Sequence, residues 1–392
     1  MQPTAMRIAV VGAGPAGLAL ALLAARLLPA AQLTLYDARP LDRDVSADPR
    51  TLALSLGSVQ LLQRLSAWPA AQAEPILEVQ VSQAPPTVAM AEVRIGAVEQ
   101  AVPMLGAVLA YGPLVATLQA AWQAAVAAEP RRLASRFGAP VAAIKPLTSG
   151  VEVDAGVAET HDLAVVAEGG VFAEQARKAL AHDYRQTAWV GTVTLEGAPR
   201  GTAFERFTRQ GPLALLPLPP AAGGTQRASM VWCVSAGDDP VRDLDAEQRR
   251  LVLQTLLPAA AGHVLAVGPL KHFALGLNAE RTLVHGRTVK IGNAAQTLHP
   301  VAGQGLNLGL RDAHALVDAL RLGGPVDAAL RRVEWARAPD RWATIATTDF
   351  LARSFTWGWP GLGTVRGAAM AALQALPPLK AALARQMMVG SR

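Results

Sequence analysis

Residues 291–312, which read IGNAAQTLHPVAGQGLNLGLRD, are the strongest indication of the fold in this chain. It predicts a short buried strand, a loop of glycine and other small residues, and a helix that begins near Gly303 and carries no charge before Arg311. The start of such a helix presents unpaired backbone N–H groups and the positive end of the helix dipole. This late glycine loop therefore predicts a site that holds an anionic or electron-rich ligand at close range.

An early glycine loop lies near the start of the chain, where residues 12–17 read GAGPAG. It follows a predicted apolar strand at residues 8–11 and opens a predicted apolar helix at residues 18–28, which is the context that a dinucleotide-binding fingerprint requires. In this fingerprint the first glycine permits a tight turn, the second lets the backbone approach a pyrophosphate, and the third lets the helix pack on the sheet. The three glycines are Gly12, Gly14 and Gly17.

A carboxylate completes the predicted dinucleotide site. A second predicted strand, residues 33–36, ends at Asp37, about 20 residues beyond the last glycine, where a carboxylate binds a ribose hydroxyl. Together the two glycine loops predict non-covalently bound FAD. Residues 6–28 also share the charged start and the apolar run of a signal peptide. The glycines at fingerprint spacing, and Pro29 in place of a cleavage site, favour a strand and a helix of the fold instead.

The composition is that of a globular protein with a sizeable core. The chain has 392 residues, 51% of them hydrophobic and 17% charged, so we expect two interleaved subdomains. The formal charge of +6 suits anionic cofactors or an anionic membrane surface, and the absence of a basic stripe with interleaved aromatics argues against nucleic-acid binding. Cys233 is the only cysteine, so we expect no internal disulfide and no cysteine-rich metal site. Because no segment offers about 18 uninterrupted apolar residues, we expect no transmembrane helix.

The order of the predicted elements indicates an α/β fold. We expect a Rossmann-like FAD-binding domain with an interleaved mixed β-sheet substrate domain and C-terminal helices. In residues 229–234 alternate side chains point to opposite faces, as in a sheet that is covered on one side. The predicted FAD-binding domain comprises residues 1–75, 111–180 and 276–325, the substrate domain residues 76–110 and 181–275, and the C-terminal helical region residues 326–392.

Three segments carry a resemblance to a known family. Residues 12–17, residues 48–55 (DPRTLALS) and residues 292–312 resemble the single-component FAD-dependent aromatic hydroxylases, and within them the hydroxylases of ubiquinone biosynthesis. Further stretches are similar to the 2-polyprenyl-6-methoxyphenol hydroxylase branch, namely FERFT at 204–208, GPLALLP at 211–217 and VWC at 231–233. The resemblance runs from about residue 7 to residue 350 and implies the aromatic hydroxylase fold.

The resemblance also implies a chemistry. NAD(P)H reduces the bound FAD, O2 adds to the flavin at C4a, and the resulting C4a-hydroperoxyflavin transfers one oxygen atom to an electron-rich phenol ring. The flavin supplies the redox chemistry, so the protein binds, orients and tunes it. The implied substrate is a polyprenylated phenol. The protein is expected in the cytoplasm, peripheral to the inner face of the membrane, with other ubiquinone-biosynthesis proteins as possible partners.

The late glycine loop is expected to tune the flavin. Reduced flavin carries negative charge near N1 and the C2 carbonyl, and the amides of Gly303, Gln304 and Gly305 are the natural groups to stabilise it. By resemblance, Pro300 lines the flavin ring near the point where oxygen reacts, and Arg50 lies against the flavin or its phosphates. Further cofactor contacts are expected from Glu168, Gly292, Asn293 and Asn307. Substrate contacts are expected from Trp232, Phe207 and Pro217.

Two positions depart from the family pattern. Asn293 replaces the usual aspartate and keeps a hydrogen-bonding side chain. The middle motif, usually Asp-Gly, reads Glu168-Gly169-Gly170, and its carboxylate is one methylene longer. This region normally engages both FAD and NAD(P)H, so a non-catalytic flavoprotein-like subunit of a lipid-biosynthesis assembly stays open as an alternative. Hydroxylation of a different ring position, or of another aromatic compound, is a second alternative.

Several side chains have two interpretations each. His299 is either a general base or a loop residue with local hydrogen bonds. Trp232 either contacts the substrate or fills the core. Four arginines of the predicted C-terminal helices form either a solvated face or a contact with anionic lipid, and three aromatic residues after them lie either in the core or at the membrane interface. These are Arg331, Arg332, Arg337 and Arg341, and Phe355, Trp357 and Trp359.

Overall fold

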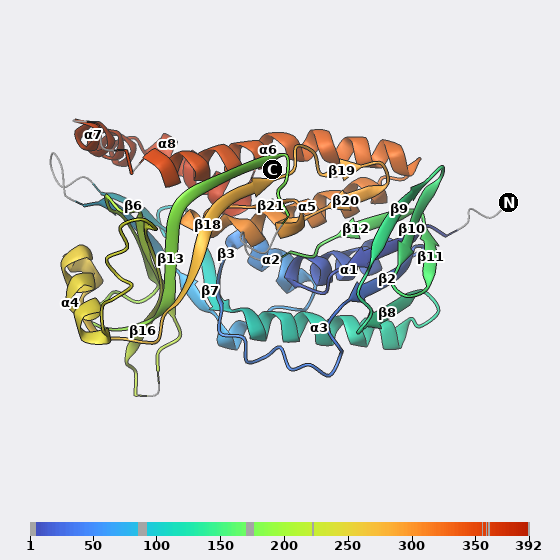
Figure 1. Cartoon of the computed structure of the whole chain (residues 1–392), viewed down its shortest axis with the longest axis horizontal. Helices are drawn as coiled ribbons and strands as arrows, with labels where there is room; N and C mark the ends of the chain where they lie inside the picture. Colours follow the sequence, from blue (N-terminus) through green and yellow to red (C-terminus); the bar gives the residue numbers. More distant parts are fainter. Residues whose placement is uncertain are drawn as a thin grey trace.

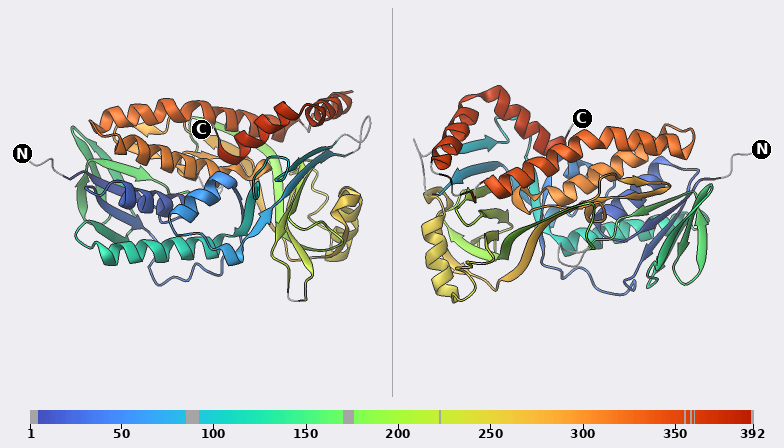
Figure 2. Two further views of the ribbon diagram at one scale, coloured as in Figure 1. Left: turned by 180° about the vertical axis from the view of Figure 1, so that it is seen from behind. Right: turned by 45° about the horizontal axis from the view of Figure 1, so that its top comes forward.

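The computed structural model describes residues 5–84, 92–169, 176–221, 223–354, 356–357, 359 and 361–390. Two large β-sheets lie side by side, and the C-terminal helices run along the top of both in Figure 1. The sheet that carries the early glycine loop is called the parallel sheet, and the other is called the large sheet. The views in Figure 2 show the same two-part arrangement from behind and from above.

The parallel sheet has six strands in the order β19-β20-β12-β1-β2-β8, all parallel except the edge strand β19. Its strands are β1 (Arg7–Val11), β2 (Gln32–Asp37), β8 (Leu133–Phe137), β12 (Leu163–Val166), β19 (Val284–His285) and β20 (Thr288–Lys290). The central strands β1 and β12 read as nearly continuous apolar runs because both faces of the sheet are covered there.

The two covers of the parallel sheet differ. Helices α1 (Pro15–Leu27), α3 (Tyr111–Ala128) and α5 (Gln304–Arg321) pack on one face. A small antiparallel sheet packs on the other through Val151 and Val153, which meet Ala9 and Val11 of β1. Its strands are β9 (Ala143–Leu147), β10 (Gly150–Asp154) and β11 (Ala158–His161).

The large sheet has the strand order β21-β18-β13-β16-β15-β14-β5-β6, and β17 pairs with β13 beside this path. Its strands are β5 (Glu78–Gln83), β6 (Val93–Gly96), β13 (Leu180–Glu196), β14 (Thr202–Phe207), β15 (Pro212–Leu218), β16 (Gln226–Ser235), β17 (His263–Val267), β18 (Lys271–Ala279) and β21 (Gln296–Thr297). Helix α4 (Ala246–Leu256) covers what we call the outer face, and the inner face turns toward the parallel sheet.

The large sheet was expected to be covered on one side only, but both of its faces are buried. Trp232 and Val234 of β16 lie in the outer core under α4. Cys233, with the opposite orientation, packs with Ala188 and Leu275 on the inner face. The alternation was predicted correctly, but the second cover comes from segments distant in sequence.

A third sheet joins the two large ones. It contains β3 (Thr51–Ser55), β7 (Gly106–Ala110) and β4 (Glu74–Ile76), and β3 leads directly into α2 (Leu56–Arg64). Residues 76–110 contribute strands to two sheets, because β5 and β6 pair within the large sheet while β7 pairs with β3.

The C-terminal helices are α6 (Val326–Ser354), α7 (Leu362–Ala375) and α8 (Pro377–Val389). Helix α6 packs along α5, α8 packs on α2, and α7 lies over β6 at the far edge of the large sheet (Figure 1). The helical character predicted for residues 326–392 is confirmed for the described part of this region. Among the described residues, we find no helix that is long and apolar enough to cross a bilayer.

The predicted beginning of the late loop needs one adjustment. The helix expected near Gly303 is α5, which is confirmed, and Gly303 is its N-cap. The strand before the loop is β20, which ends at Lys290, because Ile291 passes into a short 3-10 turn at residues 292–294. Gly292 begins that turn with a φ of +58°, a conformation that side-chain-bearing residues rarely adopt.

Candidate active site

The early glycine loop has the geometry of a pyrophosphate site. Gly14 is the N-cap of α1, and no side chain caps this helix start. A Cβ atom on Gly12 would meet Glu168, and one on Gly17 would lie 1.9 Å from the carbonyl oxygen of Gly12. A Cβ on Gly14 would meet only the Tyr111 hydroxyl, at 3.8 Å. Gly12 and Gly17 are thus required by packing, whereas Gly14 faces room that a ligand can use.

Asp37 lies at the carboxyl end of β2 beside this loop. Its carboxylate is 7% exposed, accepts a hydrogen bond from the backbone N–H of Ala13, and pairs with Arg39 at 3.1 Å. Glu168 approaches the loop from the end of β12. Burial and the nearby Asp37 raise the pKa of Glu168. Both predicted carboxylates therefore flank the early glycine loop.

Arg50 is brought to the early loop by a residue that the sequence did not single out. The Arg50 guanidinium lies 4.1 Å over the ring of Tyr111 and bonds the Asp48 carboxylate. The Tyr111 hydroxyl faces Gly14, and burial raises the pKa of this phenol. A tyrosine at the start of α3 carries no motif, so only the fold reveals this contact.

The late glycine loop packs against the early one. A Cβ on Gly309 of α5 would lie 2.8 Å from Gly292, and a Cβ on Gly292 would contact Ala16 of α1 at 3.5 Å. The two helix starts are therefore neighbours. At the edge of this contact, the Lys178 ammonium donates to the carbonyl of Asn293 at 3.1 Å, and burial lowers the pKa of Lys178 to about 8.

The start of α5 is open. Gly303 adopts φ +59° and ψ +28°, no side chain caps the helix, and a Cβ on Gly305 would meet nothing within 4 Å. Asn307 holds this start in place. Its Oδ1 accepts from the Ser55 N–H at 2.8 Å, and its Nδ2 donates to the carbonyls of Ala53 and Gly303 at 3.0 and 2.9 Å. The Asn307 side chain therefore positions the loop.

His299 fastens the late loop to the large sheet. The Val301 N–H donates to its Nδ1 at 3.2 Å, so Nε2 carries the proton and donates to Gln186 Oε1 at 2.9 Å. The ring packs edge-on against Tyr184, and burial lowers the pKa of His299 to about 4. The imidazole is neutral with both nitrogens occupied, which supports the local hydrogen-bonding interpretation over a general base. Pro300 follows, half-buried, at the start of the loop's last turn.

The three predicted substrate residues do not share one face of the large sheet. Trp232 is 2% exposed in the outer core under α4, which supports its core interpretation. Pro217 has the same orientation as Leu215, which also belongs to that outer core. Phe207 has the opposite orientation and lies on the inner face. Of the three, only Phe207 is on the side of the glycine loops.

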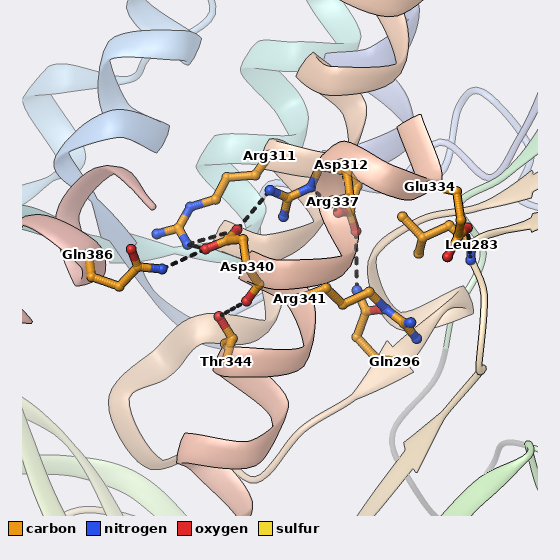
Figure 3. Close-up of polar contacts among 10 residues, drawn as sticks. All are labelled: Leu283, Gln296, Arg311, Asp312, Glu334, Arg337, Asp340, Arg341, Thr344 and Gln386. Carbon is orange, nitrogen blue, oxygen red and sulfur yellow. Dashed lines mark hydrogen bonds and ion pairs between the residues drawn. The ribbon is translucent and has the colours of Figure 1, made fainter. Parts of the chain in front are cut away.

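A buried ion-pair network anchors α5 to the C-terminal helices (Figure 3). Arg337 pairs with Asp312 of α5 at 2.8 Å and with Asp340 at 2.8 Å. Arg311 reaches the Asp340 carboxylate at 3.4 Å, and Gln386 of α8 donates to it at 2.8 Å. Burial opposes the ionisation of Asp340, but Arg337 and Arg311 outweigh it and hold its pKa below the ordinary value.

The same network reaches the large sheet. Arg341 donates to Gln296 of β21 at 2.7 Å, and Gln296 donates to Asp312 at 3.2 Å. The prediction that Arg337 and Arg341 lie on a solvated or lipid-facing helix surface is therefore wrong. Their side chains are 6% and 1% exposed, because carboxylate and carbonyl oxygens compensate the buried charge. Arg331 and Arg332 do lie on the exposed side of α6.

The residues fit FAD. Two neighbouring helix starts without side-chain caps offer backbone donors to a pyrophosphate and to an electron-rich ring, and Asp37 lies where a ribose is bound. Because Gly14 and Gly305 have no side chain, the space beside each of them is open to the cofactor. A model of the FAD binding domain family matches residues 158–324, which contain the late loop and all of α5.

Solved structures show the fold. Klebsiella pneumoniae HpxO complexed with FAD and uric acid superposes with a TM-score of 0.71 at 15% identity, over 98% of this chain and 97% of that one. P. aeruginosa PqsL in complex with 2-aminobenzoylacetate gives 0.71 at 18% identity, over 95% and 100%. The chain has the fold of the FAD-dependent aromatic hydroxylases.

Sequence relatives narrow the class. The chain is 30% identical to the 3-demethoxyubiquinol 3-hydroxylase of Escherichia coli over 400 residues, 97% of each protein. It is 37% identical to the ubiquinone hydroxylase UbiL of Rhodospirillum rubrum over 212 residues, 52% of this chain and 48% of that protein, so this second match spans only about half of the relative. The chain belongs to the family of FAD-dependent monooxygenases that serve as hydroxylases of ubiquinone biosynthesis. FAD is the cofactor of this family, and NAD(P)H is its usual co-substrate.

Proposed function

We propose that this chain uses NAD(P)H and O2 to hydroxylate the ring of a polyprenylated phenol in ubiquinone biosynthesis. The observation that supports this most strongly is the end-to-end match to a ubiquinone-pathway hydroxylase, in a chain whose two glycine loops meet at open helix starts. Bound FAD supplies the oxygen chemistry. The chain's own residues would hold the pyrophosphate at Gly14, the ribose at Asp37 and the ring against the start of α5.

The substrate is proposed to lie between the late glycine loop and the inner face of the large sheet. His299 and Gln186 already join these two surfaces by a hydrogen bond. Ala53, whose carbonyl shares the Asn307 amide with that of Gly303, belongs to the same apolar cluster as Ala203 and Leu216 of the inner face. A ring held here would be next to the helix start that stabilises negative charge on the flavin.

We further propose that the protein works at a membrane surface, on its cytoplasmic side. A polyprenyl tail does not leave the bilayer readily, because each buried methylene contributes about 0.8 kcal/mol. After Asp349 the sequence contains five basic residues and no acidic one. Large apolar side chains are exposed on the same C-terminal segment, Trp359 at 71% and Val365 at 63%. Basic charge beside exposed tryptophan suits an anionic lipid interface.

The test of the pathway role is mass spectrometry of the quinone intermediates that accumulate when the gene is deleted. We expect a polyprenylated phenol that lacks one ring hydroxyl, and its structure identifies the ring position. Complementation with the wild-type gene should clear the intermediate. Complementation with Gly14→Val should not, since a branched side chain would occupy the pyrophosphate space. Unchanged quinone content in the deletion strain would favour another aromatic substrate, and rescue by Gly14→Val would favour a non-catalytic subunit.

A further inference from the structure

Glu205 carries a carboxyl group in apolar surroundings. It lies on β14 between Phe204, which points into the outer core, and Arg206, so its side chain belongs to the inner face of the large sheet. The residue is partly buried as a whole, but its Oε1 is fully buried and has no hydrogen-bond partner in the part of the chain that the structure describes. A buried oxygen of this kind is costly unless something binds it.

Among the described residues, no cationic group neutralises Glu205. Its cross-strand neighbours are Ala214 on β15 and Val81 on β5. The adjacent Arg206 points to the other face, where it donates to Ser82 and to a backbone carbonyl. Burial raises the pKa of Glu205 to about 7, so the carboxyl changes charge near neutral pH.

Glu205 faces the proposed substrate side. Ala203, which shares its orientation on β14, packs in one cluster with Ala53, and a Cβ on Gly303 of the late loop would lie 3.2 Å from that of Ala53. Cys233, also on the inner face, is close enough that Glu205 adds to the effect of burial in raising the pKa of the thiol. The unpartnered oxygen is therefore on the side of the sheet that turns toward the start of α5.

We propose that Glu205 binds the ring hydroxyl of the phenol substrate and accepts its proton, an inference that rests on the proposed function. The phenol O–H bond breaks, the carboxylate becomes a carboxylic acid, and the ring becomes a phenolate. A phenolate is a stronger nucleophile toward an electrophilic oxygen atom than the neutral phenol. The acid returns its proton to the product oxygen, so no other co-reactant is needed.

The binding test uses 2-geranylphenol and its methyl ether, which lacks the hydroxyl proton. Each is titrated into the FAD-loaded protein at pH 8, and binding is followed by the absorbance change of the oxidised flavin. We expect the wild type to bind the phenol at least about tenfold more tightly than the ether, because a hydrogen bond to a charged group is lost with the ether. Glu205→Leu should reduce this preference to within about twofold, and Glu205→Gln, which keeps an acceptor, should fall between. Cys233→Ala is the matched control on the same face and should keep the preference.

The kinetic test is the pH profile of kcat/KM. In the wild type it should rise with pH through about 7, and in Glu205→Gln it should be flat over that range. Among the described residues on this side, the pKa of Cys233 and of Tyr184 is raised further above neutrality, and that of His299 on the late loop lies near 4, so these three groups do not produce a step near 7. His182, which contacts Tyr184, and Lys271 are present in both proteins. A step near 7 that persists in Glu205→Gln would therefore belong to another group and contradict the inference.

Thermal stability gives a third readout that does not depend on turnover. Because burial raises the pKa of Glu205, the native state is stabilised by its proton below about pH 4.5 and loses that stabilisation as pH rises through about 7. Glu205→Gln should therefore raise the melting temperature more at pH 8 than at pH 5, with FAD content unchanged.

Three outcomes overturn the inference. Equal loss of phenol and ether binding in Glu205→Leu would mean a merely structural role, and an unchanged preference would mean no contact with the hydroxyl. A wild type that binds neither compound overturns the inference and the proposed substrate together. A wild type that prefers the phenol through Glu205 but transfers no oxygen to it would leave the inference standing and overturn the proposed function.

Discussion

Gly303 and Gly305 are two residues apart in sequence, but they differ in how well they tolerate an added methyl group. A methyl group on Gly305 meets no protein atom, whereas Gly303 adopts a left-handed φ of +59° and its Cβ would lie 3.2 Å from that of Ala53. Gly305→Ala should therefore fold normally and place its Cβ where the flavin ring is expected. We expect turnover to fall about a hundredfold, as when one oxyanion donor is lost, with FAD affinity changed only a few-fold.

Gly303→Ala is the informative partner of this variant. It should lose about 1–3 kcal/mol of stability from backbone strain in addition to turnover. Stopped-flow hydroxylation, FAD titration and thermal melting separate these effects. Normal turnover in both variants would show that the start of α5 is structural only.

His299 should make stability depend on pH. The folded protein keeps the imidazole neutral with a pKa near 4, whereas the unfolded chain binds a proton below about 6.5. The stabilisation is therefore complete above pH 6.5 and falls as pH drops toward 4, by about 3 kcal/mol at most. His299→Gln should show a shallower loss of melting temperature between pH 7.5 and 5. If both proteins lose stability in parallel, His299 is not the group responsible.

At the scale of elements, the contact between α5 and α6 should be the most sensitive to a single change. Arg337→Met keeps the volume but leaves the carboxylates of Asp312 and Asp340 buried with less compensation. Breaking one side of a buried pair costs about 3–5 kcal/mol. We expect a lower melting temperature and lower FAD content, since α5 carries the late loop.

Arg331→Met is the control for this variant, because Arg331 is exposed on the same helix. It should change stability by less than about 0.5 kcal/mol. Chemical denaturation of both variants, with and without added FAD, measures the difference. Equal stability of the two would contradict the anchoring role assigned to the network in Figure 3.

The elements that sequence predicted well are those with local causes. The early loop, its helix and the start of α5 follow from glycine spacing and from an apolar run, which act within about twenty residues. The buried state of Arg337 has a local hint in Asp340, three residues on, but its other partner lies on α5, 25 residues earlier in the chain. Tertiary packing, and not the local sequence, therefore determines that Arg337 is buried.

The candidate site was predictable to a similar degree. Backbone positions such as Gly14 and Gly303 follow from motifs, so the structure places them as expected. Which face of a strand meets the loops does not follow from alternation alone, and Trp232 therefore proved to be a core residue. Tyr111 and Glu205 could not be predicted as site residues, because only the three-dimensional positions of helix α3 and strand β14 bring them to the site. In the sequence, the FERFT segment that contains Glu205 carries a family resemblance and no indication of a buried carboxyl group.

At the scale of the whole molecule, the C-terminal region should bind anionic membranes reversibly. Trp359 is 71% exposed and stacks on Trp357, so these side chains are not core residues; Phe355 lies outside the described residues. Flotation with phosphatidylglycerol vesicles should retain the protein at low salt and release it at high salt. Trp357→Ala with Trp359→Ala should weaken retention while FAD content is kept. Loss of FAD in this double variant would show that the tryptophans support the fold instead.

The most direct test of the proposed function is to measure the transfer of one oxygen atom from O2 to a prenylated phenol. The purified protein, loaded with FAD, is supplied with NADH or NADPH, 2-geranylphenol and ¹⁸O₂, and the product is analysed by mass spectrometry. We expect a hydroxylated ring that carries one ¹⁸O atom and a product that disappears in Gly14→Val. Consumption of NAD(P)H with only hydrogen peroxide formed, or a hydroxyl that carries oxygen from water, would contradict it.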